Sequence, residues 1–183
     1  MHTQPLSGIS GLSLASPQKA QSKRPQDNNF VVSLERILEG HDGRTTLMIR
    51  NIPNKYTQKM LLEKIDRLHA GKWDFFYLPI DLKNNCNVGY AFINFVDPVF
   101  IVPFYLDLNA KSWERFNSEK ICEITYGRLQ GQRELVEHFS HSADTRKVKP
   151  LVCQRDYTYL KQEANALRLQ LHAKSVAQNQ FVY

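Results

Sequence analysis

The stretch Val-Gly-Tyr-Ala-Phe-Ile-Asn-Phe, residues 88–95, decides the fold of this chain. Its apolar and aromatic content predicts a β-strand, whose successive side chains point to opposite faces. The set facing one way is Ala91, Ile93 and Phe95. The set facing the other way is Tyr90, Phe92 and Asn94. The small, apolar first set indicates a face packed against helices, which leaves the rings of Tyr90 and Phe92 on the opposite face.

The segments on either side of this strand predict the element order β-α-β-β-α-β, followed by an extra helix. The predicted strands cover residues 46–52, 73–78, 88–95 and 121–126, and the helices start at Thr57 and Asp97, with a short third helix over 132–139. This order is the split-βαβ, ferredoxin-like arrangement of α+β proteins. It predicts a four-stranded antiparallel sheet with two helices on one face and the other face free. The second helix either kinks at Pro103 or begins there, because proline cannot continue an intrahelical hydrogen-bond ladder.

Residues 88–95 also carry the motif that indicates a function. They match the RNP1 pattern K/R-G-F/Y-G/A-F-V-x-F/Y at every specified position except the first, with Ile93 replacing Val conservatively. Aromatic rings on an open sheet stack on unpaired bases, which predicts that Tyr90 and Phe92 bind RNA, with Asn94 beside them. The alternative is that both rings are ordinary core residues of a sheet covered on both faces.

The first strand supplies the partner of this motif. Residues 47–52 fit the hexamer RNP2 in hydrophobic frame, with Met48 at the position that usually carries an aromatic. The Met48 thioether can lie against a base, and Arg50, two residues on, can reach a phosphate or stack through its guanidinium plane. The alternative for Arg50 is a solvated surface charge. Lys55 in a turn and Lys83 in the loop 83–87 are predicted contacts to the RNA backbone.

The alternation leaves the phase of two strands open. On the second strand one phase groups Asp74, Phe76 and Leu78, and the other groups Trp73, Phe75 and Tyr77. On the fourth strand the two groups are Cys122, Ile124 and Tyr126 against Ile121, Glu123 and Thr125.

Charge and composition narrow the class of protein. The chain of 183 residues has a net charge of +6, which resides in the flanks, +2 in residues 1–29 and +4 in residues 140–183, so residues 30–139 are neutral. Basic flanks suit a polyanionic partner or simply aid solubility.

Three scattered cysteines, no secretory signal and no apolar run long enough for a bilayer predict an intracellular protein, nuclear and/or cytoplasmic. No Cys-x-x-Cys, Walker loop or dinucleotide glycine pattern occurs, so we expect no enzyme activity and no cofactor or metal.

The two ends of the chain are expected to differ from the domain. Residues 1–29, rich in Ser, Gln, Pro and Gly, are expected to be disordered, and residues 140–155 form a basic linker. Residues 156–178 predict an amphipathic helix. Its apolar stripe consists of Tyr157, Leu160, Ala164, Leu167 and Leu171. The stripe needs a partner: a second copy, another protein, or the open sheet. Lys174 on the stripe disfavours a homodimer, so we expect a monomer with a mobile helix that competes weakly with RNA.

The part of the sequence from about Leu34 to Phe139 closely resembles the C-terminal RNA recognition motif of the Mei-two-like proteins, RNA-binding proteins of fungi, plants and protists linked to meiosis and development. The resemblance is carried by RTTLMIRNIPNKYTQKMLLEKID, YLPIDLKNNCNVGYAFINF, IVPFY and WERFNSEKICEITYGRLQGQRELVEHF. It implies that the domain binds RNA with Tyr90 and Phe92 as its sheet platform, in post-transcriptional regulation of meiosis or development. Met48 and Pro103 are expected residues in this family. Because family members usually carry further RNA recognition motifs upstream, we expect an excised domain or a minimal member. The alternative function is a protein-interaction module that uses this fold and the C-terminal helix.

Overall fold

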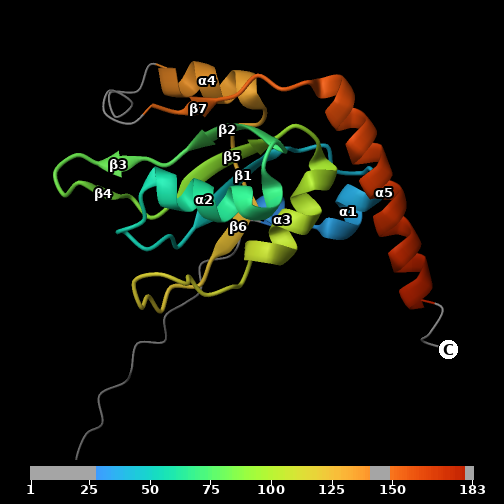
Figure 1. Cartoon of the computed structure of the whole chain (residues 1–183), viewed down its shortest axis with the longest axis horizontal. Helices are drawn as coiled ribbons and strands as arrows, with labels where there is room; N and C mark the ends of the chain where they lie inside the picture. The colour runs from blue at the N-terminus through green and yellow to red at the C-terminus, as the bar shows by residue number, and fades with distance from the viewer. Residues whose placement is uncertain (1–27, 141–148, 180–183) are drawn as a thin grey trace, which may run out of the picture.

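A computed structural model describes residues 28–140 and 149–179 of the chain (Figure 1). The main sheet is antiparallel and has the strand order β6-β1-β5-β2-β7. Its strands are β1 (Thr46–Arg50), β2 (Trp73–Tyr77), β5 (Ala91–Phe95), β6 (Glu123–Tyr126) and β7 (Leu151–Val152). A separate small hairpin pairs β3 (Ile80–Asp81) with β4 (Cys86–Asn87). The first four strands of the main sheet are the predicted ones, and β7 is an addition at the β2 edge.

Two helices, α2 (Gln58–His69) and α3 (Ile101–Leu108), cover one face of this sheet, as predicted (Figure 1). The Thr57 hydroxyl caps α2 by accepting a hydrogen bond from the backbone N–H of Met60 at 3.2 Å. A short 3₁₀ helix, η2 (Pro98–Phe100), precedes α3 and is capped by Asp97. Pro103 therefore lies within the first turn of α3, where a backbone N–H makes no hydrogen bond within the helix, so the missing N–H of proline costs nothing. The helix neither kinks at Pro103 nor begins there, and both predicted alternatives are wrong.

The main core lies between the sheet and these helices. The β5 residues predicted to face the helices are all buried in it: Ala91, Ile93 and Phe95. On β6 the phase left open by the sequence is settled, because Ile124 and Tyr126 are buried in this core. On β2, Phe76 faces the core opposite Ile93.

All four predicted strands are shorter in the structure: the first ends at Arg50 and the second at Tyr77, and the other two begin later than predicted. The third strand begins at Ala91 rather than at residue 88, because Gly89 has a φ of +93°, which lies outside the extended region. The fourth begins at Glu123, and Ile121 before it makes only an isolated bridge to Ser112.

The N-terminal segment is fastened to the edge of the sheet by one basic residue. The Arg44 guanidinium bonds the Asp42 carboxylate at 2.6 Å, lies over the Tyr126 ring at 3.7 Å from its centroid, and donates to the Asn29 carbonyl. The hydrogen bond from Arg44 holds the pKa of Asp42 below its ordinary value. Residues 1–27 of the predicted disordered tail lie outside the described part, and Asn28–Phe30 forms a short 3₁₀ helix, η1.

The C-terminal helix α5 (Tyr157–Asn179) does not lie on the sheet face but packs against the side of the main core, beside η2 and α1 (Leu34–Leu38) (Figure 1). Leu160 and Ala164 of the predicted stripe are buried there. Ion pairs fix it, Lys72 with Glu163 and Arg168 with Asp97 at 2.5 Å.

The stripe was thus predicted correctly, but its partner is none of the three surfaces considered, and the expectation of a mobile helix is corrected. The predicted linker also contains a strand, β7, while its residues 141–148 lie outside the described part. No helix within the described residues combines the length and apolarity needed to cross a membrane.

Candidate nucleic-acid interface

The two rings of the RNP1 stretch lie together on the sheet face opposite α2 and α3. Phe92 lies between Met48 on β1 and Tyr77 on β2 in the strand register, and its side chain is half-buried. Tyr90 precedes the strand and meets Phe92 edge to face, with ring centroids 5.7 Å apart at 76°. The alternative that both are fully buried core residues does not hold, because each keeps part of its surface accessible.

The turn before β5 sets the position of Tyr90. The Gly89 N–H donates to the Asn87 side-chain oxygen at 2.8 Å, and the Gly89 carbonyl accepts from the N–H of Ile52 at 2.9 Å. The Asn87 amide in turn donates to the Pro53 carbonyl at 2.8 Å. These bonds hold the backbone just before Tyr90 against the segment that follows β1.

Met48 and Arg50 share this face with Phe92, as predicted. Met48 is half-buried, opposite Phe92 on one side and Thr125 on the other. Arg50 is exposed, and its Nε lies 3.9 Å from the Glu123 carboxylate. A partly exposed pair at this distance contributes little to stability, so the guanidinium can exchange this contact for a phosphate.

The other half of the face is covered by the short third helix, in a position that the sequence did not predict. Helix α4 (Gln132–Ser140) lies along this side (Figure 1), and its own Leu135 and Phe139 side chains are buried against the sheet. The Phe139 ring contacts three rings of the face, with centroids 4.7 Å from Tyr77, 5.3 Å from Phe92 and 6.1 Å from Phe75. The helix was predicted from its apolar residues, but its place on the sheet was not.

Phe75 and Tyr77 owe their position on this face to an irregularity in β2. The strand register shifts between Trp73 and Phe75, so Trp73 faces the main core while Phe75 and Tyr77 face α4. A bulge of this kind puts residues of one alternating set on different faces. Neither phase considered for the sequence was therefore right for the whole strand.

Asn94 was predicted to contact RNA, and the structure corrects this. Its side chain is only 3% exposed. The amide nitrogen donates to Asp74 at 2.8 Å, and the oxygen accepts from the hydroxyls of Thr45 and Thr46 at 2.8 and 2.7 Å. Asn94 is a structural residue that joins three strands, because α4 and its flanking turn close this end of the face.

Asp74 links the same network to the C-terminal segment. Its second carboxylate oxygen accepts a hydrogen bond from the Tyr157 hydroxyl at 2.7 Å. Burial raises the pKa of Asp74, and burial together with this bond raises the pKa of Tyr157 to about 12. The start of α5 is therefore tied to the sheet rather than loosely tethered.

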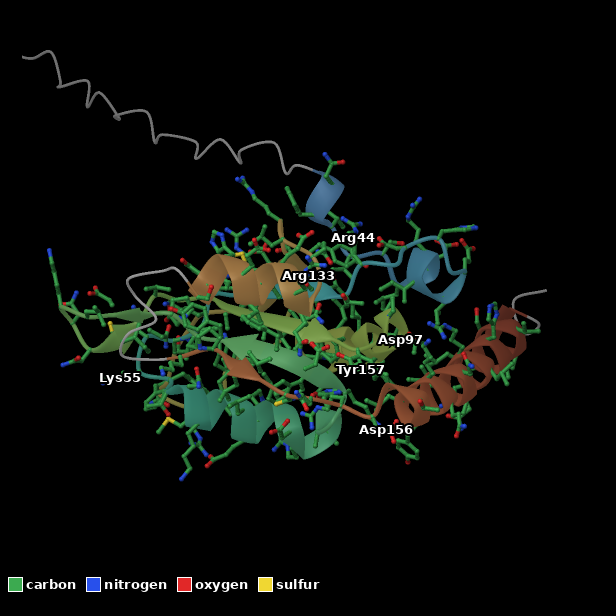
Figure 2. All side chains as sticks on the ribbon, turned by 90° about the horizontal axis from the view of Figure 1, so that it is seen from above. Arg44, Lys55, Asp97, Arg133, Asp156 and Tyr157 are labelled. Atoms are coloured by element: carbon green, nitrogen blue, oxygen red, sulfur yellow. The ribbon has the colours of Figure 1, made fainter. Side chains whose placement is uncertain are left out.

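Lys55 and Lys83, the predicted backbone contacts, are both exposed. Lys55 lies in the turn after β1, and Figure 2 shows it at the end of the sheet opposite Asp97 and Asp156. Lys83 lies at the tip of the β3–β4 hairpin, where Asp81 accepts from its backbone N–H at 2.8 Å. Within residues 28–140 and 149–179, no group of three or more His, Cys, Asp or Glu side chains is placed to hold a metal ion.

A βαββαβ sheet with RNP1 aromatics on the face opposite its two helices defines an RNA recognition motif. Comparison with known families agrees, because the model of the family "RNA recognition motif 2" matches residues 44–140, more than half of the chain. The chain belongs to this family.

The chain is similar to plant proteins whose names confirm the resemblance to the Mei-two-like family. Protein MEI2-like 2 of Oryza sativa subsp. japonica is 53% identical over 137 residues, covering 73% of this chain and 16% of the relative. Protein MEI2-like 5 of Arabidopsis thaliana is 58% identical over 114 residues, covering 62% of this chain and 14% of the relative. The chain thus spans about a sixth of the length of these relatives.

Solved structures with a similar fold include the Rna15 RRM with bound RNA (GU). It has a TM-score of 0.41 and 20% identity, and the match covers 52% of this chain and 97% of that one. The Sex-lethal RNA recognition domains 1 and 2 from Drosophila melanogaster match with a TM-score of 0.39 and 21% identity, over 46% of this chain and 50% of theirs.

Proposed function

We propose that this chain binds single-stranded RNA, without catalysis, on the half of the sheet face that α4 leaves uncovered. The observation that carries the proposal is the pair of partly accessible rings, Tyr90 and Phe92, beside Met48 and the exposed Arg50. Rings held on a sheet in this way stack unpaired bases. Membership of the RNA recognition motif 2 family supports the same function.

The RNA binds beside α4 rather than in its place. Lifting α4 would expose four side chains that are buried between the helix and the sheet: Phe75 and Tyr77 of β2, and Leu135 and Phe139 of α4. At about 1.5–3 kcal/mol for each buried apolar side chain, opening would cost roughly 6–12 kcal/mol. Micromolar binding supplies only about 8 kcal/mol in total, so an RNA that had to displace α4 would gain almost nothing.

Electrostatic attraction contributes modestly to this binding. Residues 30–139 carry no net charge, so the phosphate contacts come from a few side chains such as Arg50, Lys55 and Lys83. Each phosphate neutralised on a single strand contributes a slope of about −0.7 to log K against log salt. We therefore expect a shallow salt dependence, and a steep one would indicate that charges outside this face dominate.

The test is an RNA titration of the Tyr90→Ala variant, followed by fluorescence anisotropy. Loss of a stacked base costs about 1–3 kcal/mol, so the affinity should fall roughly fivefold to a hundredfold. Tyr159→Ala is the matched control, because Tyr159 is a 62% exposed tyrosine on α5, away from the sheet face. Equal affinities of the Tyr90→Ala variant and the wild-type chain would refute the proposal.

The biological setting is proposed on the same basis. The resemblance to the Mei-two-like family is the basis for proposing a role in post-transcriptional regulation of meiosis or development, on messenger RNA, and the names of the MEI2-like relatives agree with its meiotic part. The three cysteines, all free thiols in the structure, support an intracellular location, nuclear and/or cytoplasmic. Crosslinking followed by RNA sequencing would identify the bound RNAs, and recovery of no RNA above background would contradict this setting.

A second candidate is a protein-interaction module. The observation that favours it is the exposed apolar pair Leu169 and Val176 in the C-terminal half of α5. The inner stripe of α5 already packs against the chain's own core, so a protein partner would meet the outer side of the helix, where these two side chains are exposed. Sedimentation of the whole chain tests self-association, and we expect a monomer.

A further inference from the structure

Phe116 lies at the surface, in the loop between α3 and β6, with a backbone conformation that phenylalanine rarely adopts. It is 43% exposed, and its φ of +71° is followed by +44° at Asn117. For a bulky residue a positive φ is a genuine outlier, and it persists only where the surrounding structure enforces it. Backbone strain of this kind is often found at ligand-binding positions.

The ring of Phe116 stands at the outer end of a row of aromatic side chains. Its edge packs on Tyr56, with centroids 5.4 Å apart at 81°, and Tyr56 packs on Trp113, at 5.2 Å and 61°. Both supporting rings are buried. Phe116 is therefore held on a rigid support while part of its own surface stays accessible.

The same loop is fastened to the end of β1 next to Tyr90. The backbone N–H of Ile52 donates to the carbonyl of Gly89, the residue before Tyr90, at 2.9 Å. The carbonyl of Ile52 accepts from the Lys120 ammonium at 3.2 Å, and Lys120 also bonds the Asn54 side chain at 2.7 Å. One residue at the end of β1 is thus bonded to the RNP1 stretch and to the Phe116 loop.

The charges near Phe116 favour a polyanion over an apolar protein segment. Arg115, Lys120 and Lys55 are exposed. Residues 114–120 contain two carboxylates. Glu114 is paired with Lys64 at 2.7 Å, so only the charge of Glu119 is left to offset the three cations. An accessible ring among cations is the arrangement that binds single-stranded nucleic acid by stacking and phosphate contacts.

We propose that Phe116 is a second stacking platform for the RNA strand that binds the sheet, with Lys55 and Lys120 contacting phosphates between Tyr90 and Phe116. The RNA strand would leave the sheet at the Arg50 end and continue onto the loop between α3 and β6. This loop lies away from α5 (Figure 1). This inference rests on the proposed RNA binding by the sheet and extends it to a longer RNA.

RNAs of two lengths distinguish binding at Phe116 from binding at the sheet platform of Tyr90 and Phe92. The whole chain is titrated with randomised-sequence RNA of about four and about ten nucleotides, lengths within the range that single-stranded binding sites cover. Phe116→Ala should weaken binding of the longer RNA roughly fivefold or more and leave the shorter one unchanged. Tyr90→Ala should weaken both, and Tyr159→Ala neither.

Phe116→Leu guards against a structural explanation, because it keeps an apolar contact with Tyr56 but removes the ring. It should weaken the longer RNA nearly as much as Phe116→Ala. Equal affinities of wild type and Phe116→Ala for the longer RNA would overturn the proposal. Equal weakening of both lengths would also overturn it. Failure of Tyr90→Ala to weaken either RNA would instead refute the proposed function itself.

The charged part of the platform is tested by salt dependence. Lys55→Gln should reduce the slope of log K against log salt by about 0.7 for the longer RNA. Lys161→Gln on α5 is the control, because Lys161 is also exposed but lies at the other end of the domain. An unchanged slope for Lys55→Gln would remove Lys55 from the site.

Discussion

Replacing Phe139 by Ala tests whether α4 is a permanent part of the sheet's second face. Phe139 is 9% exposed and packs on the rings of Phe75, Tyr77 and Phe92. Truncation of a buried phenylalanine to alanine costs about 3–5 kcal/mol, and the residual exposure of Phe139 places the expected loss near about 3 kcal/mol. Denaturant unfolding should show this as a lower midpoint, and hydrogen exchange should show faster exchange of the α4 amides. Val136→Ala, in the same helix but exposed, should cost less than about 1 kcal/mol.

The effect of Phe139→Ala on RNA affinity follows from the same numbers. With an opening cost of roughly 6–12 kcal/mol in the wild type, a loss of about 3 kcal/mol still leaves α4 closed in nearly all molecules. RNA affinity should therefore change by less than about threefold. Tenfold tighter binding would show that α4 and RNA compete for the face, and a stability loss below about 1 kcal/mol would refute the packing argument itself.

Three further substitutions test the packing and the ion pair. Ala91→Leu should overpack the helix-facing side of β5 by about 1–3 kcal/mol and lower the melting temperature, and an unchanged temperature would contradict the assigned face. Because Arg44 lowers the pKa of Asp42 below its ordinary value of 3.8, this pair stabilises the fold above pH 3.8 and the stabilisation is lost as the pH falls through the lower, folded-state pKa. Asp42→Asn should thus be less stable than wild type at pH 7, with a difference that shrinks in acid, and a pH-independent difference would exclude the ion pair as its cause. Tyr157→Phe should cost about 1–2 kcal/mol in denaturant unfolding, because it removes a hydrogen bond to a buried carboxylate, whereas Tyr159→Phe should cost almost nothing.

Some features could be predicted from the sequence because they depend on neighbouring residues alone. The alternation around Ala91 predicts which side of β5 meets the helices. The side chains of Thr57 and Asp97 cap helices that begin at the next residue, so these helix starts also depend only on nearby residues. The apolar stripe of α5 is equally local, because helical spacing alone brings its members to one face. The RNP1 stretch likewise indicated the face on which Tyr90 and Phe92 lie together.

Other features were decided only by tertiary structure, because they depend on which surfaces compete for the same apolar residues. Periodicity shows that α4 and α5 each have an apolar side, but not that α4 covers the sheet and α5 the side of the core. The register shift in β2 sends Phe75 to the face under α4. Asn94, which strand alternation placed on the open face beside Phe92, is buried. The position of the Phe116 ring was also decided by the tertiary structure. Its support by Tyr56, sixty residues away in the chain, exists only because folding brings the end of β1 beside the loop before β6.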